Sequence, residues 1–221
     1  MVLFRQAIVK FLSGLLAVAL LLFLPAGTFA YWQAWLLIGV LFLPMFVAGL
    51  VLLRRSPALL RRRLDAREEQ REQKSVILLS GLMFLAAFVL AGLGRRLQWS
   101  TLPPAVSWVA AAAFLLAYAL YAEVLRENAY LSRTVGVEEG QQLVDTGLYG
   151  VVRHPMYTST VLLFLAMPLI LGSLPAFAVT LLYIPIIVRR IRNEERVLEA
   201  GLPGYAEYER RVPWRLLPRV W

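Results

Sequence analysis

Long runs of apolar residues decide what this chain can fold into. A helix needs about 17 to 25 predominantly apolar residues to cross a bilayer. Four runs meet this requirement, at residues 7–24, 32–53, 76–93 and 104–125. Of the 221 residues, 60% are hydrophobic, which is more than a soluble domain of this size can keep away from water. The sequence therefore predicts an all-α, polytopic integral membrane protein.

A fifth apolar stretch, 156–188, is too long for one helix and is interrupted by the turn signal Gly172-Ser173-Leu174-Pro175. It predicts a C-terminal hairpin of two short helices, 156–171 and 175–190, each near the lower limit for spanning. We therefore expect six spans, with five as the alternative. The first run has no small-residue cleavage site and is interpreted as a retained helix, not a signal peptide.

The distribution of charge predicts the orientation. With the N-terminus inside, all 14 acidic residues and all 23 basic residues except Arg95 and Arg96 fall on the cytosolic side. We expect both termini and any polar site to be cytosolic, in the inner membrane of a bacterium or archaeon. The net charge of +9 then reflects topology and contact with anionic lipid, not nucleic acid. The mixed-sign segment 61–74 is expected to be a solvated helix that extends the third span.

The chain is expected to be a single membrane-embedded domain, with an N-terminal four-helix region (1–125) and a C-terminal region (126–221). It contains no cysteine and a single histidine, His154. Thiol catalysis, cysteine-ligated metals and a histidine-cluster metal site are therefore excluded, and no metal site is predicted.

The most informative segment is 141–157, with the sequence QQLVDTGLYGVVRHPMY. The residue before a proline is disfavoured in a helix, and proline suits the first helical position, so His154 is predicted to cap the helix that Pro155 begins. The N–H groups and dipole of such a helix start favour an anionic ligand group. Gly147 and Gly150 allow the preceding loop to bend closely around it.

Two further polar clusters follow, at 189–195 and 203–213. Arg190 and Glu194 are one helical turn apart, and the hairpin brings them back beside His154. Tyr205 and Tyr208 also have helical spacing. Taken singly, these arginines could be helix-end residues that extend to the interface, and the tyrosines could be interface anchors. Their convergence on one hairpin mouth favours a functional site.

Three motifs make the chain similar to a known family. They are L-V-x-x-G-x-Y-x-x-x-R-H-P-x-Y before the hairpin, R-x-x-x-E-E-x-x-L at its end, and Y-x-x-Y-x-x-x-V-P after it. Together they resemble the isoprenylcysteine carboxyl methyltransferases, a family allied to the membrane phospholipid N-methyltransferases. The likeness covers about residues 141–218. Leu148 and Ser159 depart from the usual proline and glycine, and the chain has fewer spans than the animal enzymes.

The resemblance implies an integral membrane methyltransferase that uses S-adenosylmethionine and has no Rossmann domain. It implies a cofactor-binding set made up of Gln141, Gln142, Leu143, Val144, Tyr149, His154, Pro155, Met156, Tyr157 and Glu194. Arg190 matches a position implied in contacting the carboxylate of the acceptor, so Arg190 and Glu194 are the catalytic candidates. Supporting roles are implied for Arg153, Glu195, Tyr205 and Tyr208.

The acceptor is expected to be lipophilic and to arrive from the bilayer, while the cofactor arrives from the cytosol. A carboxylate acceptor needs no general base and suits the guanidinium fork of Arg190, which favours O-methylation of an isoprenylcysteine-like substrate. A phospholipid or a small thiol remains an alternative acceptor. Two other classes also stay open: an NADPH-dependent membrane lipid reductase and a non-catalytic membrane protein.

Overall fold

The computed structural model describes residues 2–64, 71–100, 102–131, 135–137 and 140–221, and every regular element in these ranges is helical. In chain order the helices are α1 (Val2–Ala26), α2 (Trp32–Arg55), α3 (Pro57–Leu64), α4 (Arg71–Leu97), α5 (Pro104–Glu127), the short 3₁₀ helix η1 (Gly147–Gly150), α6 (Pro155–Ile170), α7 (Leu174–Thr180), α8 (Tyr183–Gly201) and α9 (Tyr205–Arg211).

Five helical segments of the described chain are long and apolar enough to cross a membrane. They are α1, α2, α4, α5 and the combined α7–α8 segment Leu174–Gly201. Helix α6 is equally apolar but has 16 residues, slightly short of the usual spanning length. The prediction of an all-α, polytopic membrane protein is confirmed, and the ambiguity between five and six spans comes down to α6.

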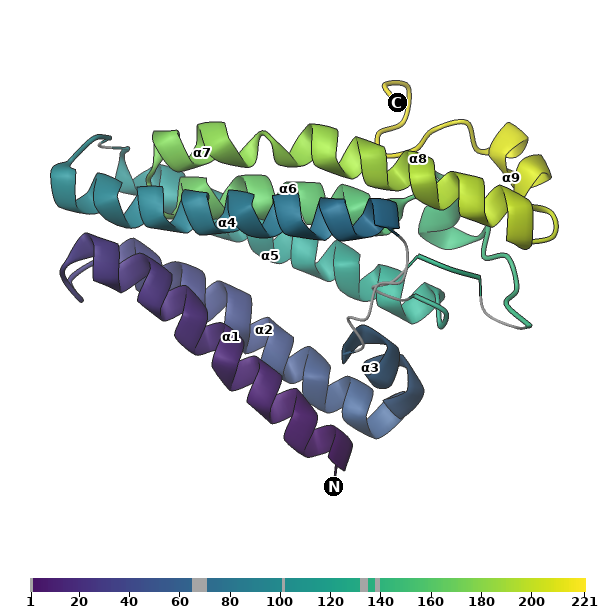
Figure 1. The fold of residues 1–221 in the computed structure, drawn as a ribbon, viewed down its shortest axis with the longest axis horizontal. Coiled ribbons are helices and arrows are strands. Elements are labelled where there is room, and N and C mark those ends of the chain that lie inside the picture. Colours follow the sequence, from purple (N-terminus) through teal and green to yellow (C-terminus); the bar gives the residue numbers. More distant parts are fainter. Residues whose placement is uncertain (1, 65–70, 101, 132–134, 138–139) are drawn as a thin grey trace.

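The long helices form a bundle with two distinct ends (Figure 1). Helices α4, α5, α6 and α7–α8 run side by side, while the α1–α2 hairpin contacts them at one end and diverges at the other. The charged end, where the hairpin diverges, contains α3, α9 and the segment between α5 and α6. The opposite, apolar end contains the short connections, and there the Tyr31 hydroxyl donates to the Leu171 carbonyl at 2.7 Å.

The predicted hairpin turn at Gly172 and Ser173 is present and well capped. Gly172 has φ +68°, which favours glycine, and its N–H donates to Leu169 while the Ser173 N–H donates to Pro168. The Ser173 hydroxyl then accepts from the Ala176 N–H and caps α7. This tight turn fixes α7–α8 antiparallel to α6.

The second helix of the hairpin differs from its predicted range of 175–190. It is interrupted at Leu181 and Leu182, and α8 continues as far as Gly201. Pro185 explains the interruption, because a proline cannot donate to the carbonyl four residues earlier but is tolerated in the first turn of a new helix. This continuation matters for function, because it keeps Arg190 and Glu194 on one helix that extends well beyond the apolar segment.

In the described part of the N-terminal region there is one helix more than the four expected. Ser56 precedes a proline and therefore ends α2, and Pro57 begins α3. Leu59 and Leu60 are buried on one face of this short helix. The predicted extension of the third span over 61–74 is confirmed only from Arg71, where α4 begins. Residues 61–64 belong to α3 instead, and 65–70 lie outside the described residues.

Close packing between α1 and α4 depends on Gly92. A Cβ placed there would lie 2.7 Å from the Leu22 carbonyl oxygen and 2.9 Å from Pro25 Cβ, whereas a Cβ at Gly81 on the same helix meets nothing within 4 Å. We therefore expect Gly92→Ala to destabilise the fold by about 1–3 kcal/mol through overpacking. Gly81→Ala should be neutral or stabilising by up to about 1 kcal/mol, because alanine is the better helix former.

Denaturant titration of the two variants in detergent, followed by circular dichroism, checks this contrast. Equal stability of Gly92→Ala and Gly81→Ala would show that α1 shifts away from α4 without cost.

Candidate active site

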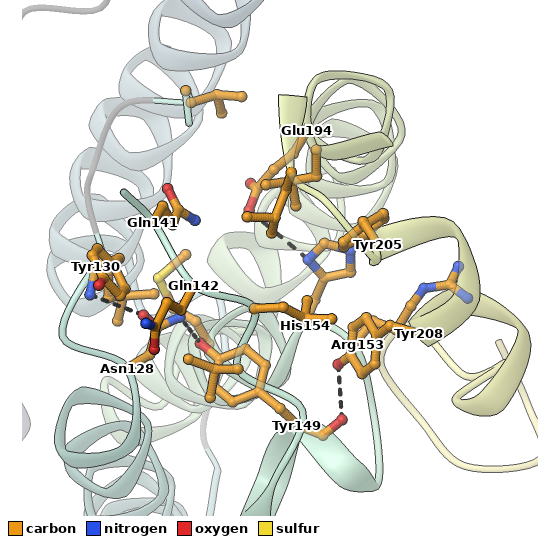
Figure 2. Close-up of a pocket in the computed structure, with 18 of the residues that line it drawn as sticks. Asn128, Tyr130, Gln141, Gln142, Tyr149, Arg153, His154, Glu194, Tyr205 and Tyr208 are labelled. Atoms are coloured by element: carbon orange, nitrogen blue, oxygen red, sulfur yellow. Dashed lines mark hydrogen bonds and ion pairs between the residues drawn. The ribbon is translucent and has the colours of Figure 1, made fainter. Parts of the chain in front are cut away.

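A pocket opens at the charged end of the bundle, between the start of α6, the middle of α8, α9 and the segment after α5 (Figure 2). It opens to the solvent, and its enclosed cavity has a volume of about 100 Å³. Gln141, Gln142 and Tyr130 lie on one side of it, and His154, Tyr205 and Glu194 lie on the other.

Helix η1 places Tyr149 in the pocket wall. The Glu127 carboxylate accepts from the Leu148 N–H at 3.0 Å, which fixes the start of η1 against the end of α5. Gly147 has φ +54°, which favours glycine, and a Cβ there would displace the Glu127 carboxylate. The Tyr149 hydroxyl accepts from the Asn128 side-chain amide at 3.0 Å. The bend predicted at Gly147 is therefore real, and a carboxylate of the protein itself fills the space beside it.

The chain around His154 is held by the C-terminal segment. The Arg153 and His154 N–H groups donate to the carbonyls of Trp214 and Arg215 at 2.8 and 3.0 Å. His154 occupies the N-cap position of α6, as predicted. Pro155 has no N–H, and the Tyr157 N–H donates to the His154 carbonyl at 2.9 Å. The helix start therefore offers fewer free donors to an anion than its position in the sequence suggests.

Glu195 is the centre of a buried ion-pair network. It is 4% exposed, and one carboxylate oxygen accepts two hydrogen bonds from Arg153, at 2.8 and 3.0 Å. The same oxygen lies 3.2 Å from Nε2 of His154, and the other oxygen accepts from Arg215 at 2.8 Å. Arg153 also pairs with Glu209 at 2.8 Å. With both oxygens occupied, Glu195 joins α6, α8 and the C-terminal segment and is not available as a base.

Glu194, the adjacent residue, faces the pocket. It accepts a hydrogen bond from the Tyr157 hydroxyl, and its carboxylate lies 4.0 Å from Nδ1 of His154. The Tyr157 hydroxyl also accepts from Nε of Arg190 at 2.8 Å, and that guanidinium lies 5.8 Å from the centre of the Tyr157 ring. Arg190, Tyr157 and Glu194 thus form one polar row along the pocket wall.

The pocket tyrosines are neutral hydrogen-bonding groups. Burial raises the pKa of the Tyr149, Tyr205 and Tyr208 hydroxyls above their ordinary value. Tyr208 uses its proton to donate to the Tyr149 carbonyl at 2.8 Å. Tyr205 is 3% exposed, lines the pocket, and its hydroxyl has no hydrogen-bond partner in the structure. A buried hydroxyl without a partner is costly, so Tyr205 indicates a polar ligand atom at this position.

Most residues singled out from the sequence meet at this pocket. Those that line it are Gln141, Gln142, Leu143, Val144, Tyr149, Arg153, His154, Met156, Tyr157, Arg190, Glu194, Tyr205 and Tyr208. Pro155 and Glu195 are buried nearby but are not part of the lining.

Seven lining residues were not anticipated: Asn128, Tyr130, Leu131, Val135, Gly136, Leu198 and Leu202. The first five belong to the segment after α5, which contains no motif and reaches the pocket only through tertiary packing. Leu198 could have been found, because it continues the α8 face of Arg190 and Glu194 at a spacing of four residues.

Comparisons with known proteins point to the same part of the chain. Residues 105–202, which run from α5 through α8, match the family model for phospholipid methyltransferases. The match covers less than half of the chain. It supports the broad family predicted from the motifs but does not single out the isoprenylcysteine enzymes.

Three curated relatives match over similar lengths. The chain is 34% identical over 91 residues to Delta(14)-sterol reductase TM7SF2 of Mus musculus, which is 40% of this chain and 22% of that protein. It is 38% identical over 85 residues to Delta(14)-sterol reductase of Arabidopsis thaliana, 37% of this chain and 23% of that protein. It is 38% identical over 79 residues to the cobalt-zinc-cadmium resistance protein CzcN of Cupriavidus metallidurans, 35% of this chain and 36% of that protein.

The chain thus spans less than a quarter of the length of these sterol reductases. The shared segment supports a membrane protein with a methyltransferase-like or sterol-reductase-like site. The comparisons leave the substrate unspecified.

Proposed function

We propose that this protein is an integral membrane methyltransferase that uses S-adenosylmethionine and acts on a lipophilic acceptor. The match of residues 105–202 to the phospholipid methyltransferase family supports this reaction class, because that segment builds most of the pocket. The observation that carries the proposal is the charge of the pocket lining.

The described lining contains two cationic side chains, Arg153 and Arg190, and one carboxylate, Glu194. Arg153 is neutralised within the protein by Glu195 and Glu209, each at 2.8 Å. The net charge of the remaining lining, Arg190 and Glu194, is therefore close to zero, and the Glu194 carboxylate faces the cavity. This suits a ligand that carries an amine, a carboxylate and a sulfonium. It suits NADPH poorly, because its three phosphates call for several cationic groups that have no partner carboxylate.

The residues around the pocket fit such a cofactor. Glu194 would accept from its amine or a ribose hydroxyl, and the unpartnered Tyr205 hydroxyl would hydrogen-bond a further polar atom. Segment 141–144 would pack against the rest of the cofactor. When bound, S-adenosylmethionine supplies an electrophilic methyl group on sulfur. The protein's contribution to the transfer would be to align the acceptor in line with that methyl group and to exclude water.

The acceptor is proposed to be a lipophilic carboxylate, as in an isoprenylcysteine. A carboxylate is ionised at neutral pH and needs no base. This matches a pocket in which burial raises the pKa of Tyr205 and Tyr208, and beside which Glu195 is fully engaged. Arg190 would hold the acceptor carboxylate through its guanidinium fork. A phospholipid amine or a thiol is the alternative acceptor, and each would require the loss of a proton.

Under the positive-inside rule, the charged end and its pocket face the cytosol. The cofactor would then arrive from solution, and the acceptor would arrive from the bilayer. A location in the inner membrane of a bacterium or archaeon is part of the proposal.

A membrane lipid reductase that uses NADPH is the second candidate, and the identity to Delta(14)-sterol reductases is the observation that favours it. The two reactions require different cofactors in the same pocket, so cofactor binding separates them.

Calorimetry of the purified protein with S-adenosylhomocysteine and with NADPH tests the proposal. We expect micromolar binding of S-adenosylhomocysteine and at least tenfold weaker binding of NADPH, together with transfer of labelled methyl from S-adenosylmethionine into a membrane lipid and protein extract. Tight binding of NADPH alone would establish the reductase, and binding of neither compound would point to a non-catalytic protein.

A further inference from the structure

Helix α3 places a further guanidinium, that of Arg63, beside Met156 of the pocket lining. Arg63 is half-buried and donates to the Tyr121 hydroxyl of α5, with its guanidinium carbon 5.5 Å from the centre of that ring. Its other terminal nitrogen lies 3.9 Å from the sulfur of Met156, which lines the pocket. The contact with Tyr121 has the same form as the contact that Arg190 makes with Tyr157.

The two arginines flank the first turn of α6. Met156 and Tyr157 are consecutive, so their side chains leave the helix about 100° apart. Arg63 approaches Met156 from α3, and Arg190 approaches Tyr157 from α8. The pocket wall at this point is therefore bordered by a guanidinium on each side, supplied by parts of the chain more than 120 residues apart.

The position of α3 suits the head of a membrane lipid. Helix α3 begins two residues after α2 ends, so it starts at the depth where that span leaves the bilayer. Leu59 and Leu60 anchor it, and the N-terminal span fixes its end through a hydrogen bond from Lys10 to the Leu64 carbonyl. An amphiphile with its chain in the bilayer would present its head group at this level.

We infer that Arg63 binds the carboxylate of a lipophilic acceptor together with Arg190, so that the acceptor lies across Met156 and Tyr157. This inference rests on the proposed function, because it names the chemistry of that acceptor. A thioether sulfur is a weak hydrogen-bond acceptor, so a carboxylate oxygen that takes the place of the Met156 sulfur at this Arg63 nitrogen binds more strongly. Arg63 is thereby the residue that selects anionic acceptors.

Helix α3 also provides matched controls. Arg61 is exposed and on the same helix, and its loss removes the same charge. Arg62 donates to the Ala129 carbonyl at 2.6 Å and lies 5.6 Å from the centre of the Tyr130 ring, so it fastens the segment after α5.

The test measures binding of oleate and of methyl oleate in neutral detergent by calorimetry, for the native protein and for the Arg63→Gln, Arg63→Lys and Arg61→Gln variants. The native protein should prefer oleate by about tenfold or more, the strength expected of charge-assisted hydrogen bonds. Arg63→Gln should reduce the preference to threefold or less, Arg63→Lys should keep part of it, and Arg61→Gln should keep all of it.

Binding of S-adenosylhomocysteine is measured on the same samples. If Arg63→Gln retains both cofactor affinity and the native preference for oleate, the role of Arg63 is refuted. If the native protein binds no S-adenosylhomocysteine but loses its preference for oleate on Arg63→Gln, the methyltransferase proposal fails while the carboxylate site stands. A preference lost equally in Arg61→Gln reflects net charge and overturns the inference.

Discussion

Glu194→Gln is expected to weaken binding of S-adenosylhomocysteine by about 10- to 100-fold. The substitution keeps the shape of the side chain but removes the negative charge that faces the pocket. A hydrogen bond to a charged group contributes roughly 1.5–3 kcal/mol, which corresponds to this range of affinities. Glu194 also orients Tyr157, so methyl transfer should fall by at least the same factor.

Two measurements separate a cofactor role from a structural one. The first is calorimetry beside the control Glu207→Gln, which removes an exposed carboxylate from α9 and should leave the affinity within twofold. The second is the unfolding midpoint in detergent, which should change little for either variant. If both variants lose affinity equally, long-range charge and not contact is responsible, and Glu194 has no direct role.

The sequence predicted the fold because a bilayer imposes simple requirements on length and polarity. Each predicted span in the first 125 residues lies within an observed helix, and the turn at Gly172 and Ser173 is where the pattern places it. Pro185 marks a kink in the second helix of the hairpin, and the structure has an interruption at Leu181, four residues before that proline. Helix α3 was missed as a separate element because its last residues, 61–64, were assigned to the helix that extends the third span.

The site residues that belong to a motif could be predicted from the sequence. The predicted hairpin explains how motif segments about 40 residues apart meet. The other lining residues reach the pocket only through tertiary contacts. Helical spacing alone does not separate Glu194, which faces the cavity, from Glu195, which is buried against Arg153; only the family resemblance gave the two residues different roles. Likewise, nothing in the sequence predicts that the segment containing Tyr130 folds over the pocket. Two consecutive residues of a helix lie on different faces, and which face points into the pocket is known only when the packing of the neighbouring helices is known.

Glu195→Gln is expected to destabilise the protein by about 3–5 kcal/mol, the usual cost of removing one member of a buried ion pair. The amide keeps the volume of the side chain but leaves Arg153, which is 4% exposed, short of the charge that balances it. It also weakens the hydrogen bonds from His154 and Arg215. Unfolding of the variant in a denaturant titration should therefore occur well before that of the native protein.

The surface pair of Arg211 and Asp145 provides the control, because both side chains are partly solvent-exposed. Arg211→Gln should cost less than about 1 kcal/mol. The double variant Arg153→Met/Glu195→Gln should lose less stability than the two single variants together. Each single change leaves the other residue buried without its partner, and the double change removes both. Strict additivity in this cycle would mean that the two residues act independently. In that case the link between the start of α6 and α8, and with it the shape of the pocket, would have to depend on Arg215 and the C-terminal segment instead.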